Sequence, residues 1–203
     1  MNNKILFGIG GILVGVIITL LLSPMLWFGS MMPWRTGLAP GQWPAGMGSI
    51  DRHFIEQMIP HHDGAIAMAN LAIQKSQRQE IKTLANAIIE AQSKEIKDMR
   101  IWYKDWFGKD VSDKAYVMMG GMMSQGGMHM GGQEDIKILE ASADFDKAFI
   151  EAMIPHHQLA IMMAQMLKSG TNRPEMSSLA DDIIQSQLKE IKEMQDWYKN
   201  WYK

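Results

Sequence analysis

The chain contains no cysteine, and its formal net charge at pH 7 is only −2. Without cysteine there is no Cys-x-x-Cys-His motif of the kind that attaches a c-type haem. The nearly balanced charge offers no basic surface for nucleic acid, so nucleic acid is not an expected partner. The sequence also lacks the βαβ pattern and the strand-like alternation of apolar and polar residues. These absences indicate an all-α protein.

Methionine, in contrast, is abundant, with 20 residues in a chain of 203. Methionine fills hydrophobic cores flexibly, and its thioether is also a soft ligand that prefers Cu(I). A chain that has no cysteine but is rich in methionine and histidine fits an oxidising compartment, where free thiols are at risk.

The N-terminal segment supports export. Lys4 precedes an apolar run over residues 5–22, whose length lies between a signal-peptide core and a membrane-spanning helix. No small-x-small cleavage site follows. We expect residues 1–27 to be an uncleaved signal anchor that holds the protein to a membrane, with secretion after cleavage as the alternative. Residues 28–50 are rich in glycine and proline and predict an irregular tether.

An internal repeat dominates the remainder. Residues 51–107 and 146–202 align without a gap at a constant offset of 95, the separation of His61 from His156, and about half of the positions are identical. The best-kept stretch is Phe-Ile-Glu-x-Met-Ile-Pro-His-His, at residues 54–62 and 149–157. A repeat shows which residues the duplicated unit kept, and histidine pairs are an unusual choice for packing alone.

Each repeat predicts a helical hairpin. Apolar residues recur at helical spacing over about 51–74 and 80–107, and over about 146–168 and 175–202, with Asp51 and Asp146 as suitable N-caps. A single hairpin buries too little apolar area to be stable alone, so the repeats 51–107 and 146–203 are expected to close one ferritin-like four-helix bundle. The linker 108–145 is rich in methionine and glycine, with a short helix expected near 134–140.

The repeated histidines are expected to point into this bundle. Met58, His61 and His62 have i, i+3, i+4 spacing and share a helix face with Phe54 and Ala65, which are typical core residues. Buried polar side chains need partners. A metal ion is one kind of partner, and a hydrogen bond to another side chain is the other.

The second helix of each hairpin offers residues that can meet the histidines. Gln92, Glu95 and Met99 share one face, and so do their counterparts in the second copy. Histidines hydrogen-bonded to Glu95 and Glu190 form the metal-free alternative. A histidine pair with a flanking methionine, kept twice, favours a metal site.

Pro60 and Pro155 stand directly before the histidine pairs. A proline inside a helix removes one backbone hydrogen bond and kinks the axis, which can position ligands. The alternative places each proline in the first turn of a helix, where it costs little.

Copper fits the donor set best. Zinc sites normally use cysteine, histidine and carboxylates, and a di-iron bundle requires Glu-x-x-His pairs, which are absent. Cu(I) accepts thioether and imidazole ligands, and imidazole also accepts Cu(II). In the linker, Met122, Met123, Met128, His129 and Met130 resemble a flexible, low-specificity collector of soft metal, with an oxidisable linker as the alternative. Weaker ligand candidates in the repeats are Asp51, His53, Met68, Glu95, Met163 and Glu190; His53 has no repeated counterpart.

The repeated pattern resembles the domain-of-unknown-function family 305. Asp-x-x-Phe-Ile-x-x-Met-Ile-Pro-His-His, followed by Leu-Ala-x-x-Ile-Ile-x-x-Gln-x-x-Glu-Ile-x-x-Met-x-x-Trp, occurs in both copies, over 51–107 and 146–202. The tandem, exported arrangement is similar to CopM-like proteins of cyanobacteria, which bind copper in the periplasm and contribute to copper resistance. Carried over by position, the resemblance implies as metal ligands Met58, His61, His62, Met99, Met153, His156, His157 and Met194.

Together these observations predict a periplasmic or otherwise extracytoplasmic helical bundle that prefers Cu(I), with Cu(II) as a second ligand, and that buffers copper or passes it to an efflux or transfer protein. No nucleophile–base pair or phosphate loop indicates catalysis. Two alternatives stay open. One is a metal-dependent redox enzyme such as a cuprous oxidase, and the other is a metal-free structural bundle.

Overall fold

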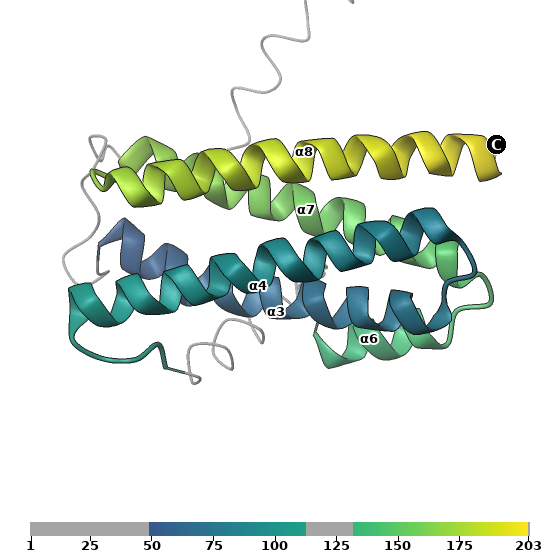
Figure 1. The fold of residues 1–203 in the computed structure, drawn as a ribbon, viewed down its shortest axis with the longest axis horizontal. Coiled ribbons are helices and arrows are strands. Elements are labelled where there is room, and N and C mark those ends of the chain that lie inside the picture. Colours follow the sequence, from purple (N-terminus) through teal and green to yellow (C-terminus); the bar gives the residue numbers. More distant parts are fainter. Residues whose placement is uncertain (1–48, 113–131, 203) are drawn as a thin grey trace, which may run out of the picture. The chain divides into compact units, whose positions relative to one another are not determined.

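The computed structural model describes residues 49–112 and 132–202, all within the unit Trp43–Lys203. These residues form the helices α3 (Ile50–Lys75), α4 (Gln79–Phe107), α6 (Gln133–Glu140), α7 (Phe145–Gly170) and α8 (Pro174–Tyr202) (Figure 1). No strand occurs in this part of the chain, and the predicted all-α bundle is confirmed. The expected anchor 5–22, residues 28–48 of the tether and the linker methionines 122–130 lie outside the described residues. None of the five helices combines the length and hydropathy that a membrane span requires.

The two long hairpin-initiating helices begin slightly earlier than predicted. The backbone N–H of Arg52 donates to Ser49 Oγ over 3.2 Å, and that of Lys147 donates to Asp144 Oδ1 over 3.0 Å. The prediction of Asp51 and Asp146 as N-caps was therefore wrong. Asp51 lies inside the first turn of α3, where its carboxylate stabilises the positive end of the helix dipole.

Both prolines lie in helix interiors. Pro60 stands ten residues after the start of α3, and Pro155 occupies the same place in α7. The alternative that each begins a helix is wrong. Because proline has no N–H, the carbonyl groups of Glu56 and Glu151, four residues earlier, lose their usual helical hydrogen bonds. Helices α3 and α7 thus each lack one backbone hydrogen bond in the turn that leads into the histidine pair.

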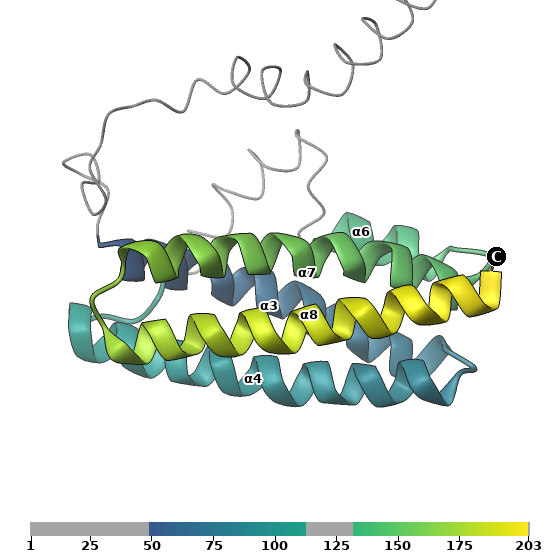
Figure 2. The ribbon, with the colours of Figure 1, turned by 90° about the horizontal axis from the view of Figure 1, so that it is seen from above.

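The helices pair as two hairpins, α3 with α4 and α7 with α8, which meet mainly through α3 and α7 (Figure 2). The first core cluster joins the N-terminal half of α3 and the C-terminal half of α4 to the C-terminal half of α7 and the N-terminal half of α8. Its buried members are Phe54, Ile55, Met58, Ile59, Met99, Tyr103, Ala160, Ala164, Leu167, Met176, Leu179, Ala180 and Ile183.

The second core cluster contains the opposite halves of the same four helices, with Leu139 of α6 added. Apart from Leu139, the offset of 95 maps each buried member of one cluster onto a member of the other cluster, or onto a residue packed against it. The two hairpins are therefore related by an approximate two-fold axis that passes between α3 and α7.

A pair of arginines fastens the hairpins to each other at both ends of the bundle. The guanidinium carbon of Arg173 lies 3.8 Å from the ring centre of Trp106, and its Nε lies 3.3 Å from Asp51 Oδ2. Arg78 repeats this arrangement on Trp201, at 4.0 Å, and on Asp146, at 3.6 Å. A planar guanidinium can stack on an indole and pair with a carboxylate at once, which favours arginine over lysine here.

Candidate metal centre

Four histidines form a layer between the two core clusters. His61 and His62 come from the middle of α3, and His156 and His157 come from the middle of α7. Each side chain is at most 1% exposed. We call these four residues the histidine layer. Their burial confirms that the repeated helix face points inward.

The rings of His61 and His156 lie against each other across the hairpin interface. Their ring centroids are 3.7 Å apart and their planes are inclined by 41°. Within the described residues, neither ring nitrogen of His61 has a hydrogen-bond partner of good geometry. Burial, and then the neighbouring imidazoles of His156, His62 and His157, lower the pKa of His61 well below its usual value, against a smaller opposing effect of the His156 backbone. The ring is therefore neutral at pH 7, which is the form that binds metal.

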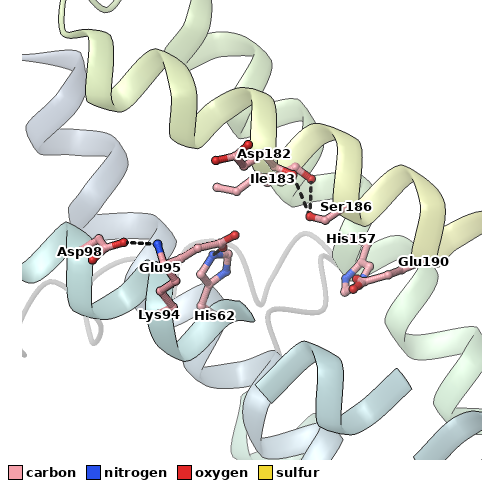
Figure 3. A network of polar contacts seen from close by, with 9 residues as sticks. All are labelled: His62, Lys94, Glu95, Asp98, His157, Asp182, Ile183, Ser186 and Glu190. Carbon is pink, nitrogen blue, oxygen red and sulfur yellow. Dashed lines mark hydrogen bonds and ion pairs between the residues drawn. The ribbon is translucent and has the colours of Figure 1, made fainter. Parts of the chain in front are cut away.

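The outer histidine of each pair is held by a carboxylate of its own hairpin. His62 Nε2 lies 2.6 Å from Glu95 Oε2, and His157 Nε2 lies 2.6 Å from Glu190 Oε2. Figure 3 shows one pair on each hairpin. With Nε2–H donated to the carboxylate, the Nδ1 atom of a neutral ring carries a free lone pair. In both rings Nδ1 has no hydrogen-bond partner among the described residues.

Two buried amides accompany the histidine layer. Gln92 and Gln187 occupy equivalent positions on α4 and α8, are 3% and 2% exposed, and have no partner for Oε1 within the described ranges. Helical spacing places both glutamines on the same face as Glu95 and Glu190, but they are not among the candidate metal ligands predicted from the sequence. Their repetition in both copies was the available signal. Each unsatisfied buried acceptor costs roughly 1–3 kcal/mol.

The four predicted methionine ligands are fully buried and lie on both sides of the histidine layer. Met58 and Met99 belong to the first core cluster, and Met153 and Met194 belong to the second. The structure thus brings each intra-hairpin methionine pair into one cluster, but it does not gather all four thioethers in a single cluster.

The weaker candidates are more scattered. Asp51 accepts a 2.5 Å hydrogen bond from Thr171 and pairs with Arg173, so it fastens the hairpins. His53 contacts Gln57 in the first turns of α3. Met68 is buried in the second core cluster, and Met163 packs against the first. No group of three or more histidine, aspartate or glutamate side chains within residues 49–112 and 132–202 is arranged to hold a metal ion.

Comparison with known proteins gives close structural relatives. The chain is similar to CopM in the Cu(I)-bound form, with 44% identity, a TM-score of 0.65, and coverage of 80% of this chain and 100% of that one. It is also similar to CopM in the Cu(II)-bound form, with 46% identity, a TM-score of 0.63, and coverage of 75% and 98%. Uncharacterized protein L153 of Acanthamoeba polyphaga mimivirus is 47% identical over 49 residues, which are 24% of this chain and only 32% of the viral protein.

A family model described as domain of unknown function (DUF305) matches residues 51–198. This one match spans both hairpins, so the prediction of two separate tandem copies of the family domain stays a prediction. Because the match covers well over half of the chain, the protein belongs to the DUF305 family.

Proposed function

We propose that this protein binds copper, that it prefers Cu(I), and that it buffers or hands over the metal outside the cytoplasm. The proposal is supported by the likeness to CopM, which has been crystallised with Cu(I), Cu(II) and Ag bound and is 44–46% identical over at least 75% of this chain. Ag has the same preference for soft donors as Cu(I), and thioethers are such donors.

The observation that carries the proposal is the composition of the histidine layer and its surroundings. The neutral ring of His61 offers one lone pair that no hydrogen bond occupies, and His62 and His157 each offer Nδ1 while a carboxylate fixes the opposite nitrogen. Fully buried thioethers lie in the clusters on either side. Imidazole lone pairs oriented by a carboxylate are a common arrangement around metal ions.

The setting favours the cuprous ion. A dry site lined with thioethers and neutral imidazoles stabilises a singly charged soft ion better than a doubly charged one, because the cost of burial rises with charge. We expect the linker methionines 122, 123, 128 and 130 with His129 to add weaker sites. Residues 1–27 then serve as a membrane anchor or a cleaved signal, and a copper efflux or transfer protein is the expected partner.

An anaerobic titration with a chromogenic Cu(I) chelator as competitor tests the proposal. The full-length protein should take copper from the chelator, and a version without residues 117–132 should lose only the weaker binding. Failure of the full-length protein to compete would overturn the proposal. We expect binding without turnover, so copper-loaded protein should not accelerate the consumption of O2.

A metal-free structural bundle is the second candidate, because the His62–Glu95 and His157–Glu190 hydrogen bonds satisfy one nitrogen of each outer histidine without any metal. The two candidates differ in one outcome. Replacing all four histidines of the layer by glutamine leaves copper uptake unchanged in a structural bundle and abolishes tight uptake in a copper protein.

A further inference from the structure

The outer face between α4 and α8 contains two cavities. One, of about 800 Å³, lies between the N-terminal half of α4 and the C-terminal half of α8 and includes Glu190. The other, of about 410 Å³, lies between the opposite halves and includes Glu95. Their linings correspond under the offset of 95, with Ala91 matched to Ser186, Asp98 matched to Glu193, and Trp102 matched to Trp197. We call them the Glu190 groove and the Glu95 groove.

Each groove reaches the histidine layer through one side chain. The side chain of Glu95 is 14% exposed in its groove, and its Oε2 lies 2.6 Å from Nε2 of His62, which is 0% exposed. Glu190 and His157 have the same exposures and the same distance. A single carboxylate therefore spans the distance from solvent to a buried imidazole, and it does so twice.

The grooves also carry an acidic excess. Beside Glu95 the lining holds Asp98, Glu175 and Asp182 against one lysine, Lys94, which is itself paired with Asp98 at 2.7 Å. The Glu190 groove holds Glu80 and Glu193 against Lys189. A concave surface with net negative charge raises the local concentration of cations and increases their rate of association.

The helix pairing explains why these openings lie here. The hairpins make their close contact through α3 and α7, whereas α4 and α8 approach each other less closely. At the middle of the α3–α7 interface, the tilted rings of His61 and His156 lie against each other. On the α4–α8 side, Glu95 and Glu190 connect the two grooves directly to the histidine layer.

We propose that the Glu95 and Glu190 grooves are the routes by which a copper ion reaches and leaves the histidine layer. This inference rests on the proposed copper binding. Glu95 and Glu190 act as positioning residues: each carboxylate attracts the hydrated cation into the groove while it keeps its hydrogen bond from Nε2–H of the histidine, and the cation then binds the lone pair on Nδ1 of that ring. The exchange replaces water by protein ligands and involves no change of oxidation state.

Filling both grooves tests the proposal. Ala91→Trp combined with Ser186→Trp places an indole at equivalent positions of the two linings and leaves the histidines and their glutamates unsubstituted. Ala67→Trp combined with Met162→Trp is the matched control, because these equivalent positions are exposed on α3 and α7. Stopped-flow transfer of Cu(I) from and to a chromogenic chelator gives the loading and release rates of the full-length protein.

The filled-groove variant should load and release copper at least roughly tenfold more slowly than wild type, with a similar dissociation constant, because a blocked route changes both rates together. The control pair should keep wild-type rates. Wild-type rates in the filled-groove variant, with helical content preserved, would overturn the access route while leaving copper binding intact. A wild-type protein that binds no copper would instead remove the proposed function.

A charge variant keeps the test decisive if the tryptophans disturb folding. Asp98→Asn with Glu193→Gln preserves the shape of both grooves and removes one negative charge from each. Its loading rate should fall several-fold at low ionic strength, and this difference should disappear in high salt, where the attraction is screened. A loading rate equal to wild type at low ionic strength would count against the proposal.

Discussion

The rings of His61 and His156, equivalent residues of the two repeats, lie 3.7 Å apart between their centroids. Equivalent residues of a two-fold arrangement can touch only close to its axis, so this contact places the axis within the histidine layer. The candidate site therefore belongs to both hairpins at once. Neither hairpin alone can bring these two imidazoles together.

The approximate symmetry predicts that the two halves of the site contribute alike. Met58→Leu and Met153→Leu should each weaken Cu(I) binding by roughly tenfold, or about 1.4 kcal/mol, because each removes one thioether. Leucine nearly conserves the volume, so the free energy of unfolding should change by less than about 1.5 kcal/mol. Competition titration and urea unfolding measure the two effects.

Met176→Leu is the matched control for these variants. Met176 is fully buried in the same cluster as Met58, but its repeat equivalent is Ile81, so its thioether is not part of the repeated set. Copper affinity should stay at the wild-type value. An equal loss in all three variants would mean that packing, rather than sulfur ligation, controls affinity.

The lowered pKa of His61 predicts a pH-dependent stability of the copper-free protein. Because folding disfavours the protonated ring, the unfolded chain binds the extra proton first as the pH falls below about 6.5. Above that pH, the contribution of His61 to the unfolding free energy should not depend on pH. Below it, the unfolding free energy should decrease by on the order of 1 kcal/mol per pH unit.

Urea unfolding of chelator-treated protein between pH 7.5 and pH 5 measures this slope, with His61→Gln as the comparison. The variant should have a flatter profile over the acidic part of the range. Identical profiles for the two proteins would contradict the assignment of a neutral, buried His61.

The carboxylate of Glu95 is expected to stabilise the fold. Glu95→Ala leaves Nε2 of the fully buried His62 without its acceptor, which should lower the unfolding free energy by roughly 1–3 kcal/mol. Glu190→Ala should have a similar effect through His157. Glu90→Ala, at an exposed position of α4, serves as the control and should change stability little. Equal stability of Glu95→Ala and Glu90→Ala would show that the buried bond contributes nothing.

Much of this fold follows from local sequence signals. Helical spacing and the repeat located each long helix to within about two residues, since apolar periodicity is strongest in long amphipathic segments. The caps were misplaced because Asp51 and Asp146 are as suitable locally as Ser49 and Asp144. Only the packed structure shows that Asp51 pairs with Thr171 and Arg173 of the other hairpin.

Contacts of the candidate site within one hairpin can be predicted from the sequence, whereas contacts between the two hairpins cannot. The His62–Glu95 contact follows from two helix faces that must meet across one turn, and it was anticipated as the metal-free alternative. The contact between the rings of His61 and His156 depends on how the two hairpins dock, which no local pattern specifies. The α4–α8 grooves have the same origin, because they form where the docked hairpins diverge.

The Cu(I) dissociation constant of His61→Gln combined with His156→Gln decides whether copper binds at the histidine layer. It is measured by anaerobic competition with a chelator, with His53→Gln as the control. His53 lies outside the repeated set and contacts Gln57 rather than the histidine layer. We expect the double variant to lose at least roughly a hundredfold in affinity and the control to keep the wild-type dissociation constant. Wild-type affinity in the double variant would contradict a copper site at the histidine layer.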